Sequence, residues 1–120
     1  MRAKLGAELA LELVADKWFV LVMAELRHGT RRYNELKRAV SGVSQRMLTL
    51  TLRKMERDGF LRRDVYPEVP PRTEYTLTPL GRSLLEPLRE LCLWANARYV
   101  EVESARRSYD ARKRAQRNVA

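Results

Sequence analysis

Side chains that bind metals or carry out redox and nucleophilic chemistry are scarce in this sequence. It has one cysteine and one histidine among 120 residues. A disulfide requires two cysteines, and a zinc site requires about four ligands, so neither can organise the fold. The pattern also lacks a nucleophile–base pair and a glycine-rich phosphate loop. We therefore expect no enzyme activity, no catalytic residues, no metal site and no cofactor.

Long apolar stretches are absent as well. The longest uninterrupted apolar run, Trp18 to Ala24, has seven residues, whereas a membrane-spanning helix needs about 18. A membrane protein is therefore not expected, and the single cysteine suits a reducing compartment such as the cytoplasm. That cysteine, Cys92, lies in a leucine-rich segment and is expected to be a small, buried apolar residue. A chain of this length is too short for two separate cores.

Positive charge is abundant and unevenly distributed. The formal net charge is +9. Residues 27–63 carry eleven basic and three acidic side chains, a net charge of +8, and residues 98–120 carry seven and three, a net charge of +4. The remaining segments are slightly acidic. Two concentrated basic segments favour a polyanionic partner, either nucleic acid or a membrane surface.

The spacing of apolar residues predicts a mainly helical chain with one β-hairpin. Ser44 and Thr78 are the expected N-caps of the fourth and fifth helices, and Pro87 should kink the fifth. The second helix is apolar nearly all round and should be the centre of the core. Beyond Asn96 we expect a continuing or separate helix with a basic end. The expected helices cover residues 3–15, 17–27, 33–40, 45–58 and 79–95, and the expected strands cover residues 60–67 and 72–77.

The fourth of these helices has two distinct faces. At about 100° per residue, Leu48, Leu52 and Met55 fall within one narrow sector and should pack on the core. The other side is mostly basic and consists of Arg46, Thr49, Leu50, Arg53 and Arg57. A helix of this kind can anchor its apolar face while presenting arginines outward.

Three helices, a break, a two-faced helix and then a hairpin are the elements of a winged helix-turn-helix. The two-faced helix would enter the DNA major groove, where arginine matches guanine. Leu50 would contact a thymine methyl group or, alternatively, make a dimer or packing contact. Arg72, at the hairpin tip, would enter a minor groove or touch a phosphate. Further phosphate contacts, or else solvated side chains, are expected at Arg31, Arg32, Lys37, Arg38, Arg62 and Arg63.

Several motifs resemble one known family. They are K-W at 17–18, R-R-Y-N-E-L at 31–36, S-Q-R-M-L-T at 44–49, E-R-D-G at 56–59, Y-P-E-V-P-P-R at 66–72 and E-Y-T-L-T-P-L-G at 74–81. Together they strongly resemble the HxlR family of bacterial winged-helix transcription regulators, over about residues 5–95. The wing motif, at residues 66–72, is long and unusual in composition, which makes the resemblance specific.

The resemblance implies a homodimeric DNA-binding regulator whose recognition helix starts at Ser44 and Gln45 and whose wing lies around Pro70 to Arg72. It also implies a dimer built from the first and last helices. The expected interface residues are Leu5, Leu9 and Leu13 in the first helix and Leu84, Leu88, Leu91 and Trp94 in the last. Those stripes independently need apolar partners.

The chain departs from the family pattern in three respects. Several members sense oxidants through a cysteine that would fall near Leu5, so the resemblance does not imply a redox switch here. Leu50 stands where members commonly have glutamine, and Lys54 where they have an acidic residue, which bears on base preference. The segment from Asn96 onward extends past the family domain.

These observations predict a winged helix-turn-helix domain over residues 1–95 and a basic helical extension over residues 96–120. The expected function is sequence-specific regulation of transcription by a cytoplasmic, nucleoid-associated homodimer that binds a pseudo-palindromic site in double-stranded DNA. The alternatives are a non-specific architectural DNA-binding protein and a winged-helix module for protein contacts. No residue pattern identifies a small-molecule effector.

Overall fold

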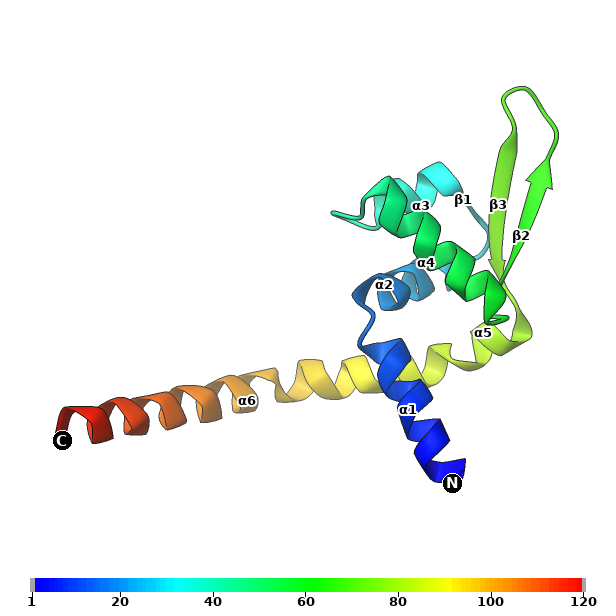
Figure 1. The fold of residues 1–120 in the computed structure, drawn as a ribbon. Coiled ribbons are helices and arrows are strands. Elements are labelled where there is room, and N and C mark those ends of the chain that lie inside the picture. Colours follow the sequence, from blue (N-terminus) through cyan, green and yellow to red (C-terminus); the bar gives the residue numbers. More distant parts are fainter. Residues whose placement is uncertain (1, 120) are drawn as a thin grey trace. The chain divides into compact units, whose positions relative to one another are not determined.

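The computed structural model of the chain describes residues 2–119, with side chains for residues 5–119. Its elements, in chain order, are α1 (Arg2–Val14), α2 (Lys17–Leu26), β1 (Arg31–Arg32), α3 (Tyr33–Ala39), α4 (Gln45–Arg57), β2 (Leu61–Tyr66), β3 (Arg72–Leu77), α5 (Pro79–Ser83) and α6 (Leu85–Val119). The chain divides into two units between Glu86 and Pro87. The mainly helical fold with a small β-hairpin wing is as expected (Figure 1).

The core of the first unit lies between α2, α3 and α4. Its most deeply buried side chains are Val22, Met23, Leu26, Leu36, Leu48 and Met55. Burying one such side chain stabilises a fold by roughly 1.5–3 kcal/mol. The rings of Phe19 and Phe60 meet edge to face with centroids 5.4 Å apart, which ties α2 to the start of the wing. Helix α2 is central, as predicted, although Leu21 on its outer side is exposed.

The sheet has three antiparallel strands in the order β1–β3–β2. Strands β2 and β3 form the expected hairpin, which projects from the helices as a wing (Figure 1). Strand β1 was not predicted, because two arginines are too few to show the alternation that marks a strand. It forms because β3 offers a free edge, on which Arg31 pairs with Tyr75 and Arg32 with Glu74.

Capping side chains mark the start of α2, α4 and α5. Ser44 accepts a hydrogen bond from the Met47 backbone N–H at 3.0 Å, and Thr78 caps α5 by accepting from the N–H of Gly81. Both caps were predicted from the sequence. Asp16, which was not predicted, accepts from two backbone N–H groups at the start of α2. Such caps each contribute about 1 kcal/mol, and the one at Ser44 fixes where α4 begins.

The helical conformation is interrupted between α5 and α6, close to the kink that was expected at Pro87. Helix α5 ends at Ser83, and α6 begins at Leu85. Pro87 therefore lies in the first turn of α6, where a missing N–H and a bulky ring cost little. The helix then runs without interruption to Val119, so the basic extension is a continuation of the last helix. None of the helices described within residues 2–119 is both long enough and apolar enough to cross a bilayer.

Candidate nucleic-acid interface

Helix α4 keeps its apolar side in the core and its basic side toward solvent. Leu48, Leu52 and Met55 are buried, as the helical spacing predicted. The outward residues line one shallow, open depression, and they are Gln45, Arg46, Thr49, Leu50 and Arg53. Arg46 and Arg53 are both exposed. The five side chains that the sequence assigned to base reading and helix entry are thus brought together on one surface.

Two of these outward residues, Thr49 and Leu50, differ in solvent exposure. Thr49 is half-buried, and its hydroxyl lies 3.2 Å from the hydroxyl of Tyr33. Leu50 is 43% exposed, so it does not pack into the core of its own unit. A large exposed apolar side chain among arginines remains available to a thymine methyl group or to a partner protein. Arg46, Leu50 and Arg53 are thus exposed on this face, whereas Thr49 is partly covered.

Tyr33 links α3 to α4 by hydrogen bonds. Its hydroxyl donates to the carbonyl oxygen of Gln45 at 3.1 Å and also contacts Thr49. The sequence predicted a helix over residues 33–40, but no local pattern indicated these hydrogen bonds of Tyr33. The bonds join the first residue of α3 to the first two turns of α4, so the angle between the two helices is constrained by a polar contact as well as by the core.

The four basic residues of β1 and α3 differ in exposure and in ion pairing. Arg31 is engaged by Glu25, with Nε 3.4 Å from the carboxylate, and its side chain is 26% exposed. Lys37 is half-buried, whereas Arg32 and Arg38 are exposed. Arg32 and Arg38 line one open groove together with the wing residues 68–73. The structure therefore brings these two arginines and the wing together, while Arg31 has a counter-ion within its own chain.

The wing arginine, Arg72, is surrounded by its own counter-ions. Its Nη1 lies 2.9 Å from the carboxylate of Glu68, and its Nε lies 3.0 Å from that of Glu74. The guanidinium also covers the ring of Tyr66, 4.3 Å from the ring centroid. Only a quarter of the side chain is exposed. An arginine at the wing tip was expected from the sequence, but the two neutralising carboxylates were not.

A second groove lies between α4 and the sheet. It is lined by Thr49, Leu52, Arg53, Glu56, Arg63 and Tyr75. Arg63 and Tyr75 are paired across the two strands of the wing, and Arg63 lies 3.4 Å from Glu56. Burial raises the pKa of Tyr75 above its usual value, against a smaller lowering by the nearby charge of Arg63. The groove therefore combines two arginines with a neutral phenol beside the outward face of α4.

Comparisons with known proteins agree with this geometry. The model of the family described as HxlR-like helix-turn-helix matches residues 13–103. The chain belongs to the HxlR family. This HxlR-family chain is 44% identical over 96 residues to the uncharacterized HTH-type transcriptional regulator YtfH of Escherichia coli, covering 80% of the chain and 76% of that protein. It is 42% identical to YkvN of Bacillus subtilis over 105 residues, which are 88% of each.

Solved structures of similar sequence share the fold. The transcriptional regulator ytfH from Salmonella typhimurium superposes with a TM-score of 0.74 at 40% identity, covering 83% of this chain and 89% of that one. The redox regulator HypR in its reduced form superposes with a TM-score of 0.76 at 36% identity, covering 82% and 98%. The HxlR-family chain is accordingly a helix-turn-helix, DNA-binding transcriptional regulator and not an enzyme.

The residues assigned to an HxlR-type dimer interface are largely uncovered in the single chain. In α1, Leu5 and Leu9 are 63% and 50% exposed, and Leu13 is half-buried. In α6, Leu91 and Trp94 are 49% and 60% exposed. Leu84 is half-buried and Leu88 is buried. Both helices thus carry apolar side chains without a partner in their own unit, which leaves the dimer prediction open to a direct test.

The prediction for Cys92 was wrong, because its side chain is exposed. It lies on α6, whose residues from 89 to 102 are all exposed in the single chain. Leucine neighbours in sequence indicated burial, but a long helix buries a residue only where another element covers that side. Within the described residues, no group of three histidine, cysteine or carboxylate side chains is arranged to hold a metal ion.

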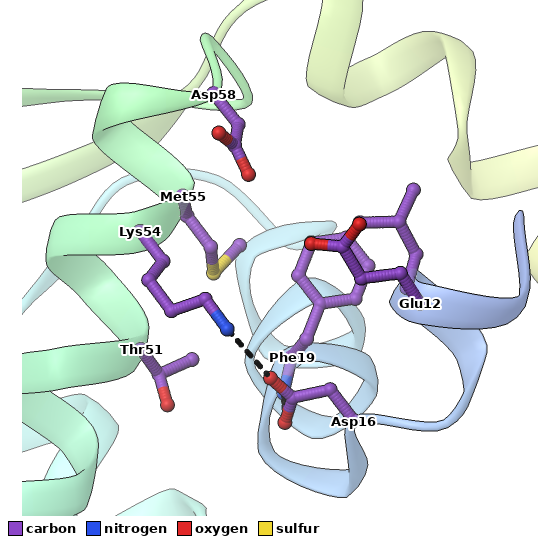
Figure 2. A pocket seen from close by; sticks show the side chains of 8 residues that line it. Glu12, Asp16, Phe19, Thr51, Lys54, Met55 and Asp58 are labelled. Atoms are coloured by element: carbon purple, nitrogen blue, oxygen red, sulfur yellow. Dashed lines mark hydrogen bonds and ion pairs between the residues drawn. The ribbon is translucent and has the colours of Figure 1, made fainter. Parts of the chain in front are cut away.

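A small acidic recess lies between α1, α2 and α4 (Figure 2). Glu12, Asp16 and Asp58 surround it, and Lys54 reaches across it to within 4.0 Å of Asp16. The cavity has a volume of about 20 Å³, which is room for about one water molecule. The recess is therefore too small for an effector, and its ion pair links α4 to the N-cap of α2.

Proposed function

We propose that this protein binds a pseudo-palindromic operator as a homodimer and places one copy of α4 in each of two successive major grooves. The observation that carries the proposal is the outward face of α4, where Arg46 and Arg53 flank an exposed Leu50 over a buried apolar back. An α-helix fits the major groove, and an arginine there can bond bidentately to guanine. The half-sites should lie about 34–36 Å apart, or a multiple of that distance.

The remaining site residues take supporting roles in this proposal. Ser44 and Gln45 begin the recognition helix, and Thr49 supports it through Tyr33. Arg32 and Arg38, with Lys37 and Arg31 beside them, contact phosphates and orient the domain. Arg72 joins them in a minor groove or on a phosphate once its carboxylates release it. Binding of this kind would place the protein in the cytoplasm, on the nucleoid.

The proposed dimer brings together the uncovered apolar side chains of the two terminal helices. Leu5, Leu9 and Leu13 would pack against a second copy, and so would Leu84, Leu88, Leu91 and Trp94. Exposed leucine and tryptophan stripes are typical of such interfaces. Residues 1–95 would form the winged-helix domain with its dimer helices, and residues 96–120 would form an extension with a role of its own.

The test compares arginines that read bases with a lysine that contacts phosphate. An operator is first selected from random-sequence DNA with the purified protein. Arg46→Ala or Arg53→Ala should then weaken operator binding by about 1–3 kcal/mol and relax the base preference. Lys37→Ala should weaken operator and random DNA alike. If all three variants lose the same affinity on both DNAs, α4 does not read the sequence.

The two alternative functions predict other results in the same experiment. A non-specific architectural protein would select no sequence and would lose most of its affinity when residues 98–120 are deleted. A module for protein contacts would not shift DNA even at low salt, where phosphate contacts are strongest. The exposed arginines of α4 favour the regulator over the second alternative.

A further inference from the structure

The end of α6 is a strongly basic segment outside the family match. The family model ends at residue 103, whereas α6 continues to Val119. Residues 104–119, here called the basic tail, carry six basic side chains and one acidic one, a net charge of +5. The preceding part of the helix, residues 85–103, has a net charge of −2. The net positive charge of α6 thus comes from its last sixteen residues.

Most of the tail's charge is not neutralised by its own chain. Arg98 and Arg106 are paired with Glu101 and Glu103 at 3.0 and 3.2 Å, and Lys113 lies over the ring of Tyr109. Four other arginines make no ion pair within the described residues, and they are Arg107, Arg112, Arg114 and Arg117. All four are exposed. They are therefore available to an anionic partner.

Three of the free arginines share one side of the helix. At about 100° per residue, Arg107, Arg114 and Arg117 fall within about 80° of one another. Asp110 is the one acidic residue on that side. Sixteen helical residues span about 24 Å, or about seven base pairs of DNA. A helix with this spacing of arginines can follow a row of phosphates.

A second copy of the chain is a poorer partner for the tail. Tyr109 and Val119 are the only large apolar residues among residues 104–119, whereas a helix pair needs an apolar residue about every 3.5 positions. Glu101 and Glu103, which could neutralise a neighbouring tail, are engaged in their own helix. Two tails side by side would also repel each other, because each carries a net charge of +5.

We propose that the basic tail binds the phosphate backbone of the DNA that flanks the operator. This inference rests on the proposed function, because it assumes that α4 has already engaged the duplex. Phosphate contacts release condensed counter-ions, so the tail adds affinity without sequence preference. Binding also relieves the mutual repulsion of its arginines, which otherwise opposes an isolated helix. The tail thereby lengthens the footprint without changing the sequence that is read.

The experiment removes two free arginines and, as a matched control, two paired arginines of the same helix. The test variant is Arg107→Gln/Arg114→Gln, and the control is Arg89→Gln/Arg98→Gln, whose arginines lie before the tail and pair with Glu90 and Glu101. Binding is measured from about 50 to 300 mM salt on a duplex of about 40 base pairs with the selected operator at its centre, and on the same operator trimmed to about 20 base pairs. Circular dichroism and sedimentation check helicity and mass.

The test variant should lose affinity only on the long duplex. The slope of log affinity against log salt is negative, and its magnitude should decrease by about 0.9 for each arginine removed per protomer. The affinity of the test variant at low salt should decrease about tenfold. On the trimmed duplex it should agree with the wild type, and the control should agree on both. Equal behaviour of test variant and wild type on the long duplex would overturn the proposal. A lower mass of the test variant with an unchanged salt slope would also overturn it.

Failure of the operator proposal can be told apart from failure of the tail proposal. If the wild type selects no sequence, the reading role of α4 is lost. The tail is then tested on random-sequence duplexes of the same two lengths. A reduced salt slope of the test variant on the longer one still supports the tail contact, and an unchanged slope still refutes it.

Discussion

Single residues on the wing control how much positive charge it presents. Arg72 lies between the carboxylates of Glu68 and Glu74, so its charge is neutralised before any DNA arrives. A phosphate must compete with these carboxylates, and partly exposed ion pairs of this kind contribute about 1 kcal/mol. The strength with which the wing binds DNA therefore depends on its acidic residues as well as on its arginine.

Replacing Glu68 should strengthen DNA binding. In Glu68→Gln the guanidinium of Arg72 keeps one carboxylate and gains freedom to reach a phosphate, so affinity should rise by up to about 1 kcal/mol, or roughly fivefold, on every sequence. Fluorescence anisotropy titrations on operator and random DNA measure the change. Glu8→Gln is the control, because it removes the same charge from an exposed site on α1. Equal gains from both variants would point to net charge alone.

The buried phenol of Tyr75 should make stability depend on pH at alkaline values. Burial raises its pKa above the ordinary 10.0, so the folded chain holds the phenolic proton to a higher pH than the unfolded chain does. This contribution is complete below pH 10.0 and is lost as the pH rises through the raised value. Denaturant unfolding at pH 9 to 11 should therefore show a steeper loss of stability for the wild type than for Tyr75→Phe. Parallel curves would contradict this expectation.

At the scale of elements, the join between the wing and α5 depends on a close approach at Gly81. A Cβ atom there would collide with the carbonyl oxygen of Phe60, and a backbone atom cannot turn aside as a side chain can. Gly81→Ala should therefore lower the free energy of unfolding by about 2 kcal/mol or more.

A second glycine supplies the matched control. Gly6 lies within α1, and nothing would meet a Cβ atom there. Gly6→Ala should raise helix stability by up to about 1 kcal/mol, since alanine favours helices over glycine. Chemical denaturation should therefore show a lower free energy of unfolding for Gly81→Ala and a higher one for Gly6→Ala. If Gly81→Ala proved as stable as the wild type, the Phe60 carbonyl oxygen would lie farther from Gly81 than the structure places it.

At the scale of the whole molecule, substitution of the exposed leucines of α1 tests the proposed dimer. The proposed dimer has twice the 14.0 kDa mass of one chain. Leu9, on the proposed interface, and Leu11, on another side of the same helix, are 50% and 66% exposed. Leu9→Glu should shift the protein toward the monomer in sedimentation and weaken operator binding, because a charge in an apolar interface is costly.

Leu11→Glu adds the same charge at an equally open position outside the stripe, and it should leave both mass and binding unchanged. A dimer that survives both substitutions would have to use other residues. Loss of the dimer in Leu11→Glu alone would assign the opposite side of α1 to the interface.

Much of the fold was predictable because local patterns specify it. The 3.6-residue period of Leu48, Leu52 and Met55 indicated which side of α4 is buried, and the capping chemistry of Ser44 and Thr78 indicated where two helices begin. The order of the expected elements indicated the winged-helix arrangement, and the family motifs around residues 31–36 and 66–81 agreed with it. These signals involve residues close together in the chain, so they can be read without knowing the tertiary contacts.

Other features arise only when distant segments meet. The strand β1 exists because β3 offers it an edge. The counter-ions of Arg72 and the hydrogen bonds of Tyr33 depend on which side chains the hairpin and the helices bring together. Cys92 is exposed although its neighbours in sequence are apolar. In each case the deciding partner lies outside the short window in which a helical or strand period can be recognised.

The sequence by itself determined the helices, the hairpin, the basic outward face of α4 and the family, since each follows from the order and period of residue types along the chain. The tertiary structure decided which arginines are free and which already hold a carboxylate, because the electrostatic energy of a charge depends on its distance to other charges. That difference separates Arg46 and Arg53 on α4 from Arg31 in β1 and Arg72 in β3.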